Sequence, residues 1–223
     1  MKRNLIMSLI ALVLLIYTVP AQAFDTVGKL GLGIDGGLAI PAGGDITADS
    51  SFSDYFDVGP AFGVHIRYGL MKEVTLETGF RYSFNKIKDD ANDDPDNEPN
   101  FVAPEIYLNG IVNFGSFFDN PDNIINPFFK AGVALVPWKI TDDGAGGDAI
   151  VLENNEEFKK TSFALNFGAG LEVFATPDLS IYAEGRYLMV FSEDEDAFGN
   201  DFGNMGNVTI NLGLTYYLPL SSH

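Results

Sequence analysis

The chain has 223 residues, a formal net charge of −18 and no cysteine. The acidic balance argues against a nucleic-acid partner, since phosphate binding requires clustered lysine and arginine. The lack of cysteine excludes disulfides and thiolate metal sites. An apolar fraction of 46% is nevertheless too high for a disordered acidic chain. We therefore expect the charge to be segregated from the apolar residues.

The first 23 residues have the pattern of a cleaved secretory signal peptide. Lys2 and Arg3 precede an apolar run over residues 5–17, and Pro20-Ala21-Gln22-Ala23 supplies a small-x-small cleavage site. An uncleaved signal anchor is the alternative. We expect the mature chain, residues 24–223, to leave the cytoplasm as one domain.

Eight segments of the mature chain alternate between large apolar residues and small or polar ones, which is typical of strands with one apolar face. In chain order they span residues 29–35, 58–68, 74–85, 102–114, 129–138, 162–173, 180–191 and 207–218. The fifth and seventh segments are less regular. Val136 and Trp138 fall on the polar side of the fifth, and Leu188 and Val190 on that of the seventh.

The connections between these segments alternate in length. Short ones lie near residues 70–73, 116–126 and 175–178, and long ones near 41–57, 88–100, 141–160 and 192–206. The long connections contain 21 of the 31 acidic residues. Short turns at one rim and long polar loops at the other are typical of an outer-membrane barrel. We predict an all-β, eight-stranded, antiparallel up-and-down transmembrane barrel with short periplasmic turns and long acidic extracellular loops.

A soluble barrel with its apolar face inside would have the same periodicity. The polar face favours the membrane version, because it is rich in small residues and its few charges nearly balance, as a narrow lumen of low dielectric requires. We predict that these charges form a structural ion-pair network in the lumen: Lys29, Asp35, His65, Arg67, Glu77, Arg81, Glu105, Lys130, Glu172, Glu184 and Arg186. Aromatic residues near the strand ends predict two interfacial girdles: Tyr68, Phe114, Phe128 and Tyr216 at one rim, and Phe84, Phe101, Trp138, Phe163 and Phe191 at the other.

The stretch GAGLEVFATPDLSIYAEGRYLMVF, residues 168–191, combines a glycine-rich strand, a Thr-Pro-Asp turn and a strand carrying Glu184 and Arg186. This hairpin resembles the one before the last strand in the small outer-membrane β-barrel family, the OmpA/OmpX-like eight-stranded proteins, with OmpW-like barrels as the second choice. The resemblance covers about residues 27–218 and implies a bacterial outer-membrane location. One departure is the chain end, Tyr216-Tyr217-Leu218-Pro219-Leu220-Ser221-Ser222-His223, because such barrels usually end in an aromatic residue.

Two sets of residues could form a functional site, and each also has a purely structural interpretation. Pairing outward from the turn at residues 70–73 would place His65 opposite Glu77, where a carboxylate could orient a base, although a satisfied lumen hydrogen bond is the favoured interpretation. The acidic loop starting at Asp94 partly fits a Ca²⁺ loop, but Pro99 occupies the position that requires glycine.

We expect no catalytic residue, cofactor or specific metal site. The predicted role is structural or surface-interactive, through the acidic loops. The expected partners are outer-membrane lipid, lipopolysaccharide and loosely bound divalent cations, and the expected state is a monomer. The first alternative is a narrow OmpW-like channel for small hydrophobic solutes, favoured by the apolar lumen positions Ile111, Val136, Leu188 and Val190. The second alternative is a lipid-modifying enzyme.

Overall fold

The computed structural model describes residues 25–47, 50–92, 97–115, 124–152, 155–193, 198 and 202–220. The predicted signal peptide and Asp94 of the candidate Ca²⁺ loop lie outside these residues. No helix in the described ranges is long and apolar enough to cross a membrane.

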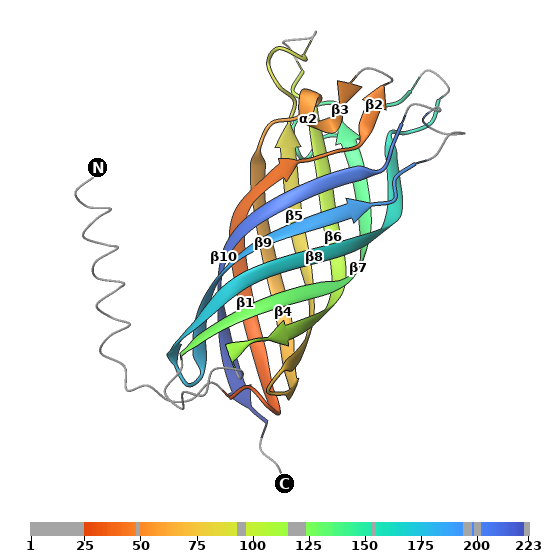
Figure 1. Cartoon of the computed structure of the whole chain (residues 1–223). Helices are drawn as coiled ribbons and strands as arrows, with labels where there is room; N and C mark the ends of the chain where they lie inside the picture. Colours follow the sequence, from red (N-terminus) through yellow and green to blue (C-terminus); the bar gives the residue numbers. More distant parts are fainter. Residues whose placement is uncertain are drawn as a thin grey trace, which may run out of the picture.

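Eight long antiparallel strands close into a barrel, as the period-two pattern predicts (Figure 1). The strands are β1 (Lys29–Pro41), β4 (Gly59–Met71), β5 (Val74–Lys86), β6 (Asn100–Asn113), β7 (Ile125–Thr141), β8 (Lys159–Thr176), β9 (Leu179–Val190) and β10 (Met205–Pro219). Each strand pairs with its neighbours in sequence, and β1 closes the barrel against β10, with Leu32 opposite Tyr216. Closure leaves no unpaired sheet edge, which is the condition for placing strands in a lipid bilayer.

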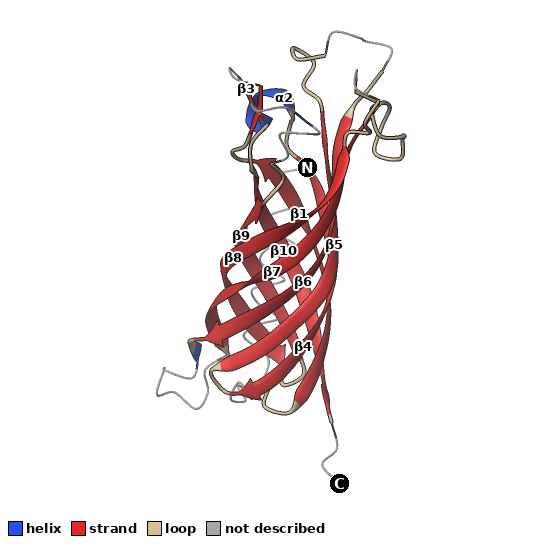
Figure 2. Cartoon of the chain, turned by 90° about the vertical axis from the view of Figure 1, so that its right-hand side faces the viewer, coloured by secondary structure: helices blue, strands red, loops and turns tan. Residues whose placement is uncertain are grey.

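The two rims differ as the connection lengths predict. Residues 72–73 join β4 to β5 and residues 177–178 join β8 to β9, whereas the connections that follow β1, β5, β7 and β9 are long. The first long connection contains β2 (Asp45–Thr47), β3 (Ser50–Ser51) and the helix α2 (Phe52–Tyr55), which lie at one end of the barrel (Figure 1; β3 and α2 also in Figure 2). β1 begins and β10 ends at the other end, beside the short turns (Figure 1).

The outer wall is apolar and the interior is charged, which is the reverse of a soluble protein. Leu212 and Ile34 are 67% and 60% exposed on the outside, while Arg67 is 2% exposed inside. An apolar wall of this kind matches hydrocarbon, and it decides against the lipocalin-like alternative. The strands have 12 to 18 residues, longer than the 9–11 that cross a bilayer, so β7 and β8 project beyond it toward the long loops.

Glycine makes room in the narrow lumen opposite large side chains. A Cβ added at Gly33 would lie 2.1 Å from the His65 ring, and one at Gly213 would lie 2.4 Å from the Tyr182 ring. An eight-stranded barrel has space for little more than its own side chains, so small and large inward residues must alternate around it.

Candidate functional site: the filled lumen and the long-loop rim

Ten of the eleven predicted lumen residues lie in the barrel interior, each with at most 8% of its surface exposed. They comprise five carboxylates, four permanent cations and His65. Lys29, the eleventh, is not part of this group. As the first residue of β1 it lies at the short-turn rim, where its Nζ donates to Asp178 Oδ1 at 2.9 Å and to the Pro177 carbonyl at 3.0 Å.

The centre of the lumen is a chain of alternating charges. Lys130 joins two carboxylates, with its Nζ 3.0 Å from Glu77 Oε1 and 2.6 Å from Glu184 Oε2. Arg67 Nε donates to Glu77 Oε2 at 2.8 Å, and Arg81 NH2 lies 3.5 Å from Glu184 Oε1. Burial of these groups is tolerated because each charge faces an opposite charge from another strand. This series of ion pairs therefore links β4, β5, β7 and β9 across the interior.

A second group of contacts surrounds Glu172 toward the short-turn end. The hydroxyls of Ser180 and Tyr217 donate to its Oε1 at 2.6 and 3.0 Å, and Arg67 NH1 donates to the same atom at 3.1 Å. Asn126 Nδ2 donates to Oε2 at 3.2 Å. The tyrosine at position 217, which the sequence analysis did not assign to the lumen, thus satisfies a buried carboxylate.

His65 is a hydrogen-bonded interior residue, and its strand partner differs from the predicted one. Glu77 pairs with Arg67 and His65 lies opposite Gly79, because a two-residue turn extends β4 to Met71 and a register shift between Gly69 and Met71 follows it. Its Nε2 is 3.1 Å from Thr215 Oγ1, and its Nδ1 is 3.6 Å from an oxygen of Asp35. His65 is only 3% exposed, although it is among the residues that line a hollow of the outer wall.

Arg186 and Glu105 form a further ion pair nearer the long loops. The Arg186 guanidinium also lies over the Tyr107 ring, 5.5 Å from its centroid. Beyond this pair the lumen changes character from charged to aromatic.

An apolar cluster closes the lumen at the long-loop end, and we call it the aromatic plug. Its buried members are Phe52, Phe56, Phe101, Ala103, Tyr107, Ala134, Val136, Trp138, Ile140, Ala164, Leu188, Val190, Phe202 and Met205. The Trp138 and Phe202 rings stack with centroids 5.7 Å apart, and the Phe52 and Phe101 rings meet edge to face at 5.0 Å. Phe52 and Phe202 belong to long connections, so these loops fold back into the barrel mouth.

The aromatic girdles are smaller than predicted. Trp138 and Phe101 are 1% and 4% exposed and face the plug, and the Trp138 indole N–H donates to Ser162 Oγ at 3.0 Å. Phe128 is likewise buried, at 4%, in the short-turn half of the lumen. Side chains alternate between the two faces of a strand, and these three residues fall on the inward face. A position near the strand end does not decide which face a side chain takes. Phe163 and Phe191 do face outward, and their rings stack at 6.1 Å.

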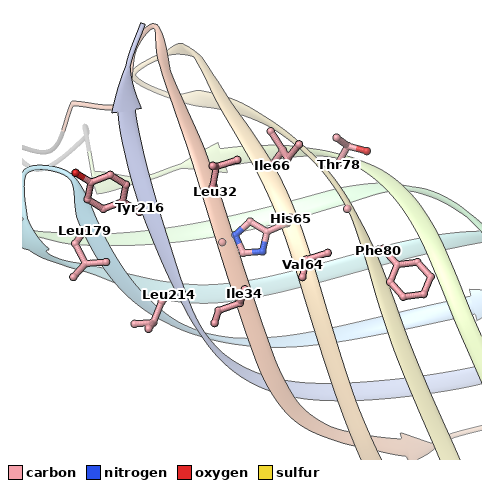
Figure 3. A pocket seen from close by; sticks show the side chains of 12 residues that line it. Leu32, Ile34, Val64, His65, Ile66, Thr78, Phe80, Leu179, Leu214 and Tyr216 are labelled. Carbon is pink, nitrogen blue, oxygen red and sulfur yellow. The ribbon is translucent and has the colours of Figure 1, made fainter.

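Several hollows mark the outer wall, among them the following two. The first, of about 690 Å³, lies over β1, β4 and β5 and is lined mainly by outward apolar side chains such as Leu32, Ile34 and Phe80 (Figure 3). His65 is also among its lining residues, and few other polar groups that could orient a ligand lie there. The second, of about 590 Å³, lies near the long loops and contains three lysines.

The described residues contain no cluster of three or more histidine, aspartate and glutamate side chains placed to hold a metal ion. The second loop, which the sequence analysis considered for Ca²⁺, is described only in part.

Comparison with known proteins gives a consistent fold. The chain resembles the surface protein NspA of Neisseria, with 15% identity, a TM-score of 0.56, and coverage of 84% of this chain and 96% of that one. It also resembles Ail of Yersinia pestis (13% identity, TM-score 0.51, 86% and 99% coverage) and OprG of Pseudomonas aeruginosa (10% identity, TM-score 0.51, 87% and 98% coverage). No curated protein matches the chain.

These likenesses establish the barrel fold alone, because the identities are low. The family relationship has independent support, since the sequence model of the outer membrane protein beta-barrel domain matches residues 9–217. With the eight-stranded closure and the apolar outer wall, this match shows that the chain belongs to the outer membrane protein beta-barrel domain family.

Proposed function

We propose that this protein is a non-enzymatic surface protein of the bacterial outer membrane, in which a closed barrel supports four acidic loops. The observation that carries the proposal is the filling of the lumen at two levels. A buried ion-pair network occupies its centre and short-turn half, and the aromatic plug occupies its outer mouth. A lumen filled in this way is a scaffold, and the variable chemistry lies in the loops above it.

The loops carry the charge that a surface partner would meet. The four long connections contain 21 of the 31 acidic residues, and the described carboxylates of Asp89, Asp90 and Asp142 are exposed. Such a concentration of negative charge attracts divalent cations and cationic groups and repels nucleic acid. We therefore expect loosely held divalent cations, bridging the loops to lipopolysaccharide phosphates, and partners with basic surfaces.

Planar-bilayer recording of the purified protein, together with protease treatment of intact cells, tests this proposal. We expect no steady conductance, and we expect external protease to cut the long loops while the barrel strands stay intact. Heat-modifiable mobility on gels provides the control for folding. Regular single-channel steps from a folded, heat-modifiable sample, or loops that are protected on intact cells, would contradict the proposal.

A passage for small apolar solutes is the second candidate, because the outer part of the lumen is apolar. Ile111, by contrast, lies with Phe128 and Tyr182 in a separate small cluster. A passage would require the plug to move, so Phe202→Ala should accelerate the entry of a small apolar dye into intact cells. Equal entry in cells with the wild-type protein, the variant or no protein would exclude this function.

A further inference from the structure

The second hollow of the outer wall lies where two strands of the barrel separate. Register pairs between β6 and β7 run from Asn100–Thr141 to Val102–Lys139 and resume at Ile106–Leu135. In that register Pro104 stands opposite Pro137, and neither residue has an N–H to donate. The neighbouring pairings, β5 with β6 and β7 with β8, continue without interruption. The hollow is therefore a consequence of two opposed prolines.

Its lining combines an apolar floor with a basic rim. Val102, Pro104, Pro137 and Tyr82 supply the floor, and Trp138, Ala145 and Thr161 complete the wall. The rim is formed by lysines 139, 159 and 160, and the described residues of the lining include no carboxylate. This is unusual in a protein with only 13 lysine and arginine residues against 31 acidic ones.

Two of these lysines stand directly opposite each other in the sheet. Lys139 on β7 pairs with Lys159 on β8, and like charges in directly opposed positions destabilise a strand pair. Lys139 Nζ donates to the main-chain carbonyl of Gly147 at 2.6 Å, and Lys159 forms a half-exposed ion pair with Glu157. Among the described residues, one carboxylate faces two opposed ammonium groups, which gives an excess of positive charge at this point of the rim.

We propose that this hollow binds a phosphorylated lipid of the outer leaflet, of the lipid A type. Its phosphate would lie between Lys139 and Lys159, and an acyl chain would follow the floor past Pro104 and Pro137. The site is at the end of β7 and the start of β8, on the long-loop side, where an outer-membrane barrel meets the lipid headgroups. The inference rests on the proposed placement of the long loops at the cell surface.

The charge pattern selects this occupant over others. A neutral phospholipid would use the floor but offer no net negative charge to Lys139 and Lys159, and a soluble anion would use the lysines but leave the apolar floor exposed. An anionic amphiphile satisfies both, and its acyl chain is already confined to the membrane.

The test titrates the folded protein in a neutral detergent with diphosphoryl lipid A and, in parallel, with the same lipid lacking its phosphates. Trp138 is the only tryptophan in the chain and is among the lining residues, but its indole packs in the aromatic plug, so its emission reports a shift of this strand on binding and the retained lipid is counted directly. Native mass spectrometry counts the lipids retained by each protein. We expect one tightly bound diphosphoryl lipid A, a change in Trp138 emission, and affinity at least tenfold weaker for the dephosphorylated lipid.

The lysine variants locate the site. Lys139→Gln and Lys159→Gln should each weaken binding about tenfold, as expected for loss of one charge-assisted contact. Lys86→Gln is the matched control, because Lys86 is an exposed lysine at the same rim, paired with Glu98 and outside the hollow. It should change the affinity less than twofold.

Three outcomes would overturn the inference: equal binding of both lipids, equal weakening by all three variants, or an emission change that follows protein concentration and so reports a second copy of the chain. If the variants are folded, heat-modifiable and non-conducting yet bind lipid A as tightly as the wild type, the lipid site fails while the proposed function stands.

Discussion

Lys130→Met is the most direct test of a closed, dry lumen. The Lys130 ammonium is 1% exposed and holds Glu77 and Glu184 at 3.0 and 2.6 Å. After the substitution Glu77 keeps Arg67 at 2.8 Å, but Glu184 keeps only a longer contact with Arg81, at 3.5 Å, and one with Asn211. Removal of one partner from a buried ion pair typically costs about 3–5 kcal/mol. We expect a loss of that size in the free energy of unfolding.

Urea unfolding in lipid vesicles, followed by Trp138 emission and by gel mobility, measures this loss. Lys86→Met provides the control, because the Lys86–Glu98 pair is about half exposed and should contribute less than about 1 kcal/mol. Adding Glu184→Gln to Lys130→Met should restore about 1–3 kcal/mol, since the unpaired charge is removed. If Lys130→Met costs no more than Lys86→Met, the lumen is hydrated and the closed-scaffold argument is wrong.

Two further predictions concern the lumen wall and the first loop. Gly213→Ala should destabilise the barrel by about 1–3 kcal/mol in the same assay, because its Cβ would meet the Tyr182 ring at 2.4 Å. Gly185→Ala, which meets nothing within 4 Å, should be nearly neutral, and equal effects would contradict the packing argument. The pKa of Asp54 should lie below its ordinary value of 3.8, because the Ser51 backbone N–H and then its hydroxyl donate to the carboxylate. The stability that these Ser51–Asp54 hydrogen bonds contribute is therefore present above pH 3.8 and is lost as the pH falls through the lowered pKa of Asp54. An NMR titration that gives Asp54 a pKa of 3.8 or higher would refute this prediction.

Strand alternation predicted which residues of each strand point inward once the small residues and balanced charges had identified the polar face as the inner one. A period of two fixes the parity of every residue once one inward residue is identified, so Arg67, Lys130 and Arg186 could be assigned to the interior without knowledge of the register. The same parity placed Trp138 on the inward face, and that signal was stronger than its position near a strand end.

Partners within the lumen could not be predicted, because they depend on the register and on contacts across the barrel. A two-residue turn and the register shift beside it moved Glu77 from His65 to Arg67, and residues far apart in the sequence, such as Asp35 and Arg81, meet only after closure. The partner of Lys29 could not be predicted either. Lys29 is the first residue of its strand, and it pairs with Asp178 of a nearby turn instead of a lumen carboxylate.

The aromatic plug changes how the acidic loops should be understood. A long loop of acidic residues alone has little reason to adopt one structure, since its charges repel and are best solvated. Phe52 and Phe202, however, are buried at 1% and 2% in the barrel mouth, and burial of a phenylalanine stabilises by about 1.5–3 kcal/mol. Each of these loops is thus fixed at an aromatic anchor, while its described carboxylates (Asp45, Asp54 and Asp57 in the first, Glu193 in the fourth) are exposed. The apolar part of the lumen thus serves to hold these two loops at the barrel mouth through Phe52 and Phe202.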